Sequence, residues 1–476
     1  KLKESSNTFL ECLKLRDKIV CMAEKLYTYA KMKRDEDNSN SKYQALTDRA
    51  VGVLTEVSAA ISYIEPEIIS LDEELLKKFI EGNAELKIYL HYIDNILREK
   101  SHILSQREEE LLALVSEIAE APSEIFSMLN NADIKFPVIV DENGEEVELT
   151  KGRYIRFLES KDRRVRKEAY EKLYEVYKGF RNTFASSLSN NIRQERFFAR
   201  VRKYNSTLEA SLSKDNVSTE VYDNLIKTVH ENLPLFYRYM EIRRKILNLD
   251  KLQMYDIYVP LVKEPMDNIP YEEACTIVEK ALEPLGDEYV GYVREAYNSG
   301  WIDVYENKGK TSGAYSWGNY VSHPYILLNY QGTIGDVFTL AHEMGHAMHT
   351  FYTNKTQPYI YSEYKIFVAE VASIMNEFLL MDYMISNSRD KEEKAYYINH
   401  YLDEFRGTLF RQTMFAEFEK IIHQKAAEGE ALTAETLSDV YKNLNQQYYG
   451  TNVESDDNIA FEWARIPHFY TSFYVY

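Results

Sequence analysis

His342-Glu343-Met344-Gly345-His346 places two imidazoles and a carboxylate within five residues of one another. On a helix, residues four apart lie on the same face, so His342 and His346 can bind one metal ion. Glu343 follows the first histidine and can reach a water molecule at that metal as a general base. Such a pattern arises by accident in on the order of one in a hundred chains of this size. The stretch therefore predicts a helix that carries a hydrolytic zinc site.

The sequence around this motif predicts a capped helix and two strands. Thr333 and Asp336 form a capping signature, and the helix that begins there runs through both histidines. Residues 301–305 and 325–330 have the composition of strands, and the second, if it forms an exposed edge, is a candidate partner for a substrate backbone. The glycines and serines of residues 309–318 predict a mobile loop. This loop is a candidate flap over a substrate, and a plain flexible surface loop is the alternative.

Glu370 is the candidate for the third metal ligand. A catalytic zinc ion keeps three protein ligands and one open position. Glu370 lies in the strongly apolar helix predicted over residues 367–383, where a lone buried glutamate requires a metal or a charged partner. Pairing with an arginine is the alternative. Glu363 is a weaker candidate, because its surroundings are polar and rich in tyrosine.

Two further residues are candidates for supporting roles. Glu377, near the same helical face as Glu370, can accept a hydrogen bond from the non-ligating nitrogen of a zinc-bound histidine. An ordinary surface glutamate is the alternative for Glu377. His349 lies one turn after His346, and we expect it to pack or to support the site, because a fourth protein ligand would close the open position.

The remainder of the chain predicts a mainly α protein. Glycine and proline are scarce, with 17 and 11 residues, and helical periodicity fills residues 1–130. We assign these residues to an N-terminal helical subdomain and residues 131–476 to a catalytic region. A β-hairpin with a glycine turn at Gly144 is predicted within residues 136–149, and helices dominate the sequence after it.

Composition and charge exclude several classes of function. The net charge of −19 argues against nucleic acids and anionic membranes as partners. No apolar run reaches the length of about 18 residues that a membrane span requires. The three cysteines, Cys12, Cys21 and Cys275, form no paired motif, which predicts reduced thiols and a cytoplasmic location. The chain begins at Lys1 rather than a methionine, which leaves an upstream segment open, and its oligomeric state does not follow from the sequence.

Five stretches of the chain serve for comparison with known families. They are His342-Glu-Met-Gly-His-Ala-Met-His349, Phe367-Val-Ala-Glu-Val-Ala-Ser373, Ser312-Gly-Ala-Tyr-Ser-Trp-Gly318, His323-Pro-Tyr-Ile-Leu-Leu-Asn-Tyr330 and Trp463-Ala-Arg-Ile-Pro-His-Phe-Tyr470. These stretches resemble the thimet-oligopeptidase-like zinc metallopeptidases, and within them the oligoendopeptidase F group. The resemblance implies a largely helical, two-lobed fold that encloses a deep channel for short unfolded peptides, with a small β element beside the zinc-binding helix. It also implies one zinc ion held by His342, His346 and Glu370, with Glu343 as the catalytic base.

The same resemblance implies a histidine and tyrosines near the carbonyl oxygen of the substrate. His468, Tyr470 and Tyr474 are the candidates for this role, and simple packing is the alternative for each tyrosine. The catalytic region of the family continues beyond the position of Tyr476. Which tyrosine stabilises the oxyanion is therefore left open.

These observations predict a zinc-dependent endopeptidase that hydrolyses short oligopeptides through an activated water molecule. A dipeptidyl carboxypeptidase of similar fold is the first alternative. A peptide-binding protein without turnover is the second, and the intact Glu343 argues against it, because a site without turnover requires no base.

Overall fold

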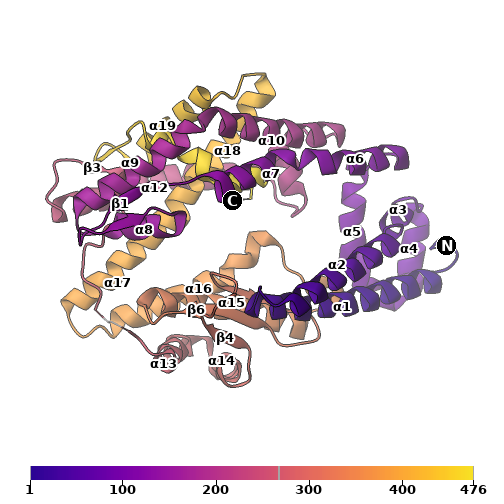
Figure 1. Cartoon of the computed structure of the whole chain (residues 1–476). Coiled ribbons are helices and arrows are strands. Elements are labelled where there is room, and N and C mark those ends of the chain that lie inside the picture. Colours follow the sequence, from indigo (N-terminus) through magenta and orange to yellow (C-terminus); the bar gives the residue numbers. More distant parts are fainter. Residues whose placement is uncertain (1, 266–267, 475–476) are drawn as a thin grey trace. The chain divides into compact units, whose positions relative to one another are not determined.

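The computed structural model describes residues 2–265 and 268–474, and its contacts divide the chain into two compact units. Each unit combines two segments that lie far apart in the sequence: Lys1–Ser101 with Glu264–Lys394, and His102–Lys263 with Ala395–Tyr476. Helices dominate both units, which confirms the prediction of a mainly α protein (Figure 1). The boundary predicted at residue 130 does not coincide with this division. The assignment of residues 131–476 as the catalytic region stays a prediction.

The first unit contains the helices that carry His342, His346 and Glu370. Its first two helices, α1 and α2, pack side by side along their lengths (Figure 1). Ser5 caps α1 by accepting a hydrogen bond from the backbone N–H of Thr8. The helices of this unit are α1 (Ser6–Glu36), α2 (Ser41–Ile61), α3 (Ile64–Ile69), α4 (Glu73–Gly82), α5 (Leu90–Glu99), α13 (Tyr271–Ala281), α14 (Asp287–Asn298), α15 (Ile334–Thr356) and α16 (Ile366–Ser386), while α17 (Lys391–Glu404) crosses into the second unit.

A three-stranded sheet lies beside α15. Its strands are β4 (Ile302–Tyr305), β5 (Tyr315–Trp317) and β6 (Tyr325–Tyr330), in the order β4-β6-β5. β4 runs parallel to β6, whereas β5 is antiparallel to it. The hypothesis that residues 325–330 bind a substrate backbone required an exposed edge, and the structure contradicts it, because β5 covers that side and leaves β6 central. Since α15 packs on both β5 and β6, the predicted β element beside this helix is confirmed.

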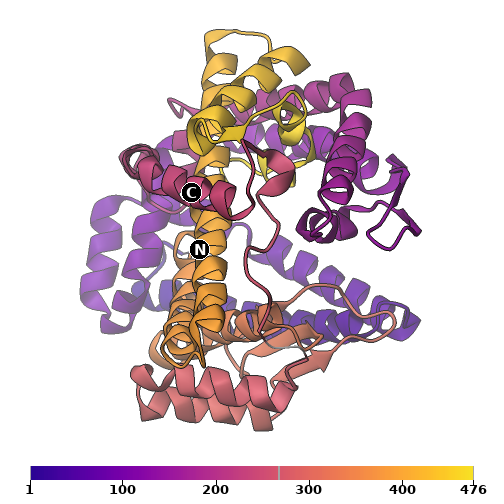
Figure 2. The same cartoon turned by 90° about the vertical axis from the view of Figure 1, so that its left-hand side faces the viewer.

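α15 is the central helix of the first unit. The predicted cap is present: Thr333 accepts a hydrogen bond from the backbone N–H of Asp336, whose carboxylate accepts from the N–H of Thr333. Leu340, Met344 and Met348 are almost fully buried along the helix. α13 and α14, drawn in pink at the base of both views, pack against it, and α13 also packs on α16 (Figure 2). These contacts hold the helix that carries the histidine pair.

The second unit is a helical assembly with four short strands, which pair into two small sheets. The predicted hairpin is present as antiparallel β1 and β2, with Gly144 at φ +85° in the turn. Buried tyrosines supply much of the core. The elements are α6 (Gln106–Ala119), α7 (Ala121–Met128), β1 (Val138–Val140), β2 (Glu146–Glu148), α8 (Lys151–Glu159), α9 (Arg163–Gly179), α10 (Arg181–Val201), α11 (Thr207–Ser213), α12 (Thr219–Ile246), β3 (Leu252–Gln253), α18 (Arg411–Glu428), α19 (Ala434–Tyr449) and β7 (Val453–Glu454).

Two predictions concern membrane-spanning helices and the state of the cysteines. Over residues 2–265 and 268–474, no helix combines the length and the apolar character that crossing a bilayer requires. The three cysteines are free thiols, as predicted.

Candidate metal centre

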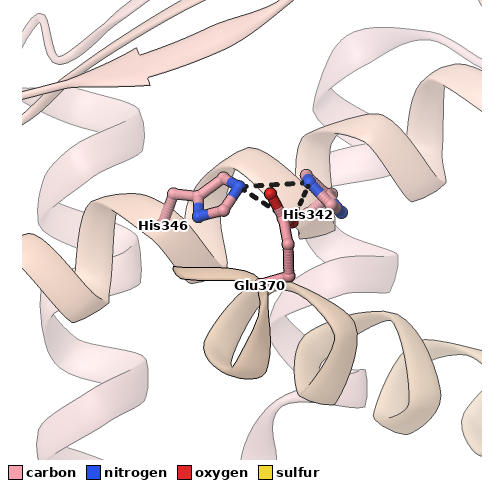
Figure 3. Close-up of side chains that lie close together, drawn as sticks. All are labelled: His342, His346 and Glu370. Atoms are coloured by element: carbon pink, nitrogen blue, oxygen red, sulfur yellow. Dashed lines mark hydrogen bonds and ion pairs between the residues drawn. The ribbon is translucent and has the colours of Figure 1, made fainter. Parts of the chain in front are cut away.

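Three side chains from α15 and α16 converge on one point. Figure 3 shows the imidazoles of His342 and His346 and the carboxylate of Glu370 directed toward one another. The Nε2 atoms of the two histidines are 3.2 Å apart. Glu370 Oε2 lies 3.2 Å from His342 Nε2 and 3.4 Å from His346 Nε2. Among the described residues, these three side chains form the cluster of ligand-type groups that could hold a metal ion.

The spacing of these donor atoms fits a tetrahedral zinc ion. Zinc–nitrogen and zinc–oxygen bonds of about 2.1 Å place the corners of a tetrahedron about 3.4 Å apart. The three measured separations, 3.2, 3.2 and 3.4 Å, lie close to that value. Two imidazoles and one carboxylate are also a donor set of the open, catalytic type, which keeps its fourth position for water. The residues present therefore fit the ion that the motif predicts.

Neighbouring charged groups shift the pKa values of His342 and Glu370. Burial lowers the pKa of His342, but the carboxylates of Glu370 and Glu377 outweigh burial and raise this pKa to about 10. Hydrogen bonds from His342 and His346 hold the pKa of Glu370 below its usual range. The three groups thus attract a positive charge to the point where they meet.

Glu343 lies on the same helix with its carboxylate buried. The residue is 7% exposed, and its Oε2 atom has no hydrogen-bond partner among the described residues. Burial raises the pKa of Glu343. A buried carboxylate oxygen without a partner is costly, so the position needs an occupant such as water or a substrate group.

Two residues on α16 contact the candidate ligands. Glu377 Oε1 lies 3.2 Å from Nδ1 of His342, the nitrogen that faces away from the cluster, so the predicted contact is present. This contact directs Nε2 of the same ring toward Glu370. Ser373, which is fully buried, donates its hydroxyl to Glu370 Oε2 at 2.9 Å. Sequence reasoning did not single out Ser373; its place three residues after a candidate ligand was the available signal.

Gly345 allows α15 and α16 to approach closely. A Cβ atom at this position would lie 2.5 Å from Cα of Ser373 and 2.7 Å from the carbonyl oxygen of Ala372. Asn376 strengthens the same crossing by donating a hydrogen bond to the carbonyl of Ala341 at 3.1 Å. The close crossing brings Glu370 within reach of the histidines.

We expect Gly345→Ala to lower stability and to weaken metal binding. The added methyl group meets backbone atoms, which cannot rotate away, so the destabilisation should be about 1–3 kcal/mol. Gly291 in α14 is the matched control, because a Cβ there meets no atom within 4 Å. Gly291→Ala should be neutral or stabilising by up to about 1 kcal/mol. Thermal unfolding and zinc titration of both variants test this, and equal behaviour of the two would contradict it.

The argument that selected Glu370 was wrong in one respect. Its side chain is 55% exposed, whereas the sequence argument assumed burial. The apolar neighbours Phe367 and Val371 are exposed as well, at 44% and 65%, because this side of α16 does not face the core of its unit. The carboxylate contacts the two imidazoles and Ser373, in place of the arginine that sequence alone left open.

His349 is not part of the cluster. Its ring stacks on Tyr364, with centroids 3.7 Å apart, and burial lowers its pKa. This is the packing role that the sequence predicts.

The candidates for the oxyanion side, His468, Tyr470 and Tyr474, belong to the second unit. Tyr470 stacks on Phe126 with ring centroids 4.2 Å apart, so it packs against the core of that unit. His468 and Tyr474 stack on each other at 5.4 Å, and Tyr474 is 48% exposed. Their role at a carbonyl oxygen stays a prediction, and residues 475 and 476 lie outside the described part of the chain.

Known proteins resemble the chain over its whole length. The curated protein "Oligopeptidase PepF" of Bacillus subtilis is 49% identical over all 476 residues, which span 71% of that protein. "Group B oligopeptidase PepB" of Streptococcus agalactiae is 44% identical over 475 residues, with 79% of it covered. The crystal structure of oligoendopeptidase-F from Enterococcus faecium superposes with a TM-score of 0.76 at 40% identity, covering all of this chain and 80% of that one.

Sequence profiles of two families match the chain. The profile described as Oligopeptidase F matches residues 67–136, and that of peptidase family M3 matches residues 156–476, which include the whole metal cluster. The resemblance inferred from the motifs is thereby confirmed. The chain belongs to peptidase family M3.

Proposed function

We propose that the protein is a zinc-dependent endopeptidase that hydrolyses internal bonds of short, unfolded peptides. The observation that carries the proposal is the convergence of His342, His346 and Glu370 at tetrahedral spacing, with the buried, unpartnered carboxylate of Glu343 on the same helix. Curated relatives that are 44% and 49% identical are named oligopeptidases, which supports peptides as the substrate class.

In this proposal, each residue of the site has its own role in hydrolysis. His342, His346 and Glu370 hold one zinc ion, and Glu377 and Ser373 fix the orientation of two of these ligands. A bound zinc ion supplies Lewis acidity, which makes water more acidic and a peptide carbonyl more electrophilic at neutral pH. Glu343 accepts the proton of the attacking water and transfers it to the leaving amine.

A peptide backbone can be bound by the edge of the sheet. Among the described residues β5 pairs with β6 alone, so its second edge offers free N–H and C=O groups. Because α15 packs on β5, a peptide added to this edge as a further strand would run next to the helix that carries His342 and Glu343. We assign this binding role to β5, where the sequence assigned it to residues 325–330.

Digestion of defined peptides tests the proposal. Metal-loaded protein should cut a short peptide internally even when its C-terminus is amidated, and it should leave folded proteins intact. Cleavage that requires a free C-terminal carboxylate and releases dipeptides would instead identify a dipeptidyl carboxypeptidase. Binding of the peptide without any cleavage would leave only the peptide-binding alternative. A reducing, cytoplasmic environment fits the free thiols and remains part of the proposal.

A further inference from the structure

One face of α1 holds β5 in place. Tyr27, Lys31 and Asp35 follow one another at intervals of four residues, which puts their side chains on one side of the helix. The ring of Tyr27 meets Trp317 edge-on at 5.9 Å, and Asp35 hydrogen-bonds to Tyr315. Tyr315 and Trp317 are alternate residues of β5 and therefore point to the same face of the sheet. The N-terminal helices, to which the sequence assigned no chemistry, thus contact the strand proposed to bind the substrate.

Asp35 makes the strongest of these contacts. It is 2% exposed, and its carboxylate is neutralised by Lys31, whose Nζ lies 2.5 Å from Oδ2. Its Oδ1 accepts a hydrogen bond from the hydroxyl of Thr311 at 2.9 Å, and Oδ2 accepts one from the hydroxyl of Tyr315 at 3.0 Å. The backbone carbonyl of Asp35 also accepts from the N–H of Thr311 at 2.8 Å. Hydrogen bonds to a buried, ionised acceptor are about twice as strong as neutral ones.

The turn that leads into β5 is held from two other sides. Asn38 donates its side-chain amide to the hydroxyl oxygen of Thr311 at 2.8 Å, and its backbone N–H donates to the carbonyl of Gly309 at 2.7 Å. From β6, the amide of Asn329 donates to the carbonyls of Thr311 and Gly313, at 2.9 and 2.7 Å. The glycine-rich stretch that sequence alone presents as a mobile loop is therefore tied to the end of α1 and to the sheet.

We infer that Asp35 is a positioning residue for peptide substrates, because it holds β5 and the turn before it in the orientation that backbone pairing with a bound peptide requires. The inference rests on the proposed function, in which the free edge of β5 pairs with the substrate backbone. A strand that is already ordered binds a peptide without an additional entropy loss of its own. Asp35 keeps the strand ordered through its hydrogen bonds to Tyr315 and Thr311. It does not touch the reacting atoms.

The kinetic signature of such a residue differs from that of the metal cluster. Backbone pairing along β5 is the same in the bound substrate and in the transition state, so its loss weakens both equally. The expected result is a higher KM with little change in kcat. A loss of general folding would instead reduce active enzyme or metal content.

The test compares Asp35→Asn with Tyr315→Phe and their combination in metal-loaded, full-length protein. Asp35→Asn should raise KM for a peptide substrate about tenfold, with kcat within about threefold of the wild type and unchanged zinc stoichiometry. Tyr315→Phe removes one hydroxyl without threatening the fold and should raise KM in the same direction. The double variant should be little worse than Asp35→Asn alone, because one change weakens and the other removes the same hydrogen bond.

Asp17→Asn is the matched control. Asp17 lies on the same helix, is 13% exposed at its side chain, and accepts a hydrogen bond from the hydroxyl of Tyr89 at 2.8 Å. This contact packs α1 on the α5 side of the unit and does not involve β5. If Asp35 acted only by holding α1 in the fold, Asp17→Asn would change KM as much as Asp35→Asn, and the inference would be overturned.

Hydrogen exchange separates failure of the inference from failure of the proposed function. Backbone amides of residues 311–317 should exchange faster in Asp35→Asn, while those of residues 342–349 should not change. A wild-type protein that loads zinc and cuts no peptide would refute the proposed function. An active wild type, together with an Asp35→Asn variant of unchanged KM and unchanged exchange at residues 311–317, would refute the inference alone.

Discussion

Glu343→Gln is expected to abolish turnover and to leave the metal in place. The substitution keeps the size and shape of a side chain that is 93% shielded from solvent, but an amide cannot accept the proton of the attacking water. General base catalysis contributes about 10²–10⁴ to rates, so kcat should fall by about a thousandfold. Zinc stoichiometry should be unchanged, since the residue is not among the three converging donors. The measurement is kcat on an internally cleaved peptide, with zinc determined on the same sample.

Glu363→Gln is the matched control for this change. Glu363 is an exposed glutamate in the connection between α15 and α16, so the same loss of charge is made close to the site but outside it. Its kcat should equal that of the wild type. A metal-loaded Glu343→Gln variant that retained more than about a tenth of wild-type kcat would remove Glu343 from its proposed role.

The parts of this molecule that sequence predicted well are the ones encoded over short distances. The helix of His342 and His346, its cap at Thr333, and the hairpin at Gly144 each depend on residues a few positions apart, where periodicity and turn chemistry operate. Gly345 carried a local signal that was not used. A glycine inside a helix is unfavourable by about 1 kcal/mol relative to alanine, which points to a close approach, here to α16.

The parts that sequence missed depend on contacts between distant segments. β5 has three residues in a glycine-rich stretch, too few to produce an alternating pattern, and it becomes a strand by pairing with β6. Without β5, the sequence does not show that β6 is a central strand. No periodic pattern in the sequence predicts that residues 264–394 fold together with residues 1–101. The contact of Asp35 with Thr311 is likewise not predicted by any such pattern. Glu370 lies beside the two histidines, but its exposure depends on how α16 packs, which its own sequence does not encode.

Removal of Glu370 is expected to cause the largest loss of metal affinity of any single change on α16. The binding free energy of zinc in small structural sites, ~10–16 kcal/mol, is shared among four ligands, so each ligand accounts for roughly 2.5–4 kcal/mol. Glu370→Ala should therefore weaken zinc binding by about a hundredfold to a thousandfold and lower activity at micromolar zinc. Because the side chain is 55% exposed, the substitution leaves no buried cavity, and unfolding should change little.

A graded series of glutamate variants separates a metal ligand from a merely nearby carboxylate. Glu377→Gln loses only the contact that orients His342, so its zinc affinity should fall by about 10–100-fold. Glu363→Gln should bind zinc like the wild type, since this exposed carboxylate lies in the connection before α16. Competition with a chromogenic chelator measures all three dissociation constants on one scale. If Glu370→Ala bound zinc as tightly as Glu377→Gln, the third ligand would have to come from another residue, and the tetrahedral spacing of the donor atoms would not reflect the bound state.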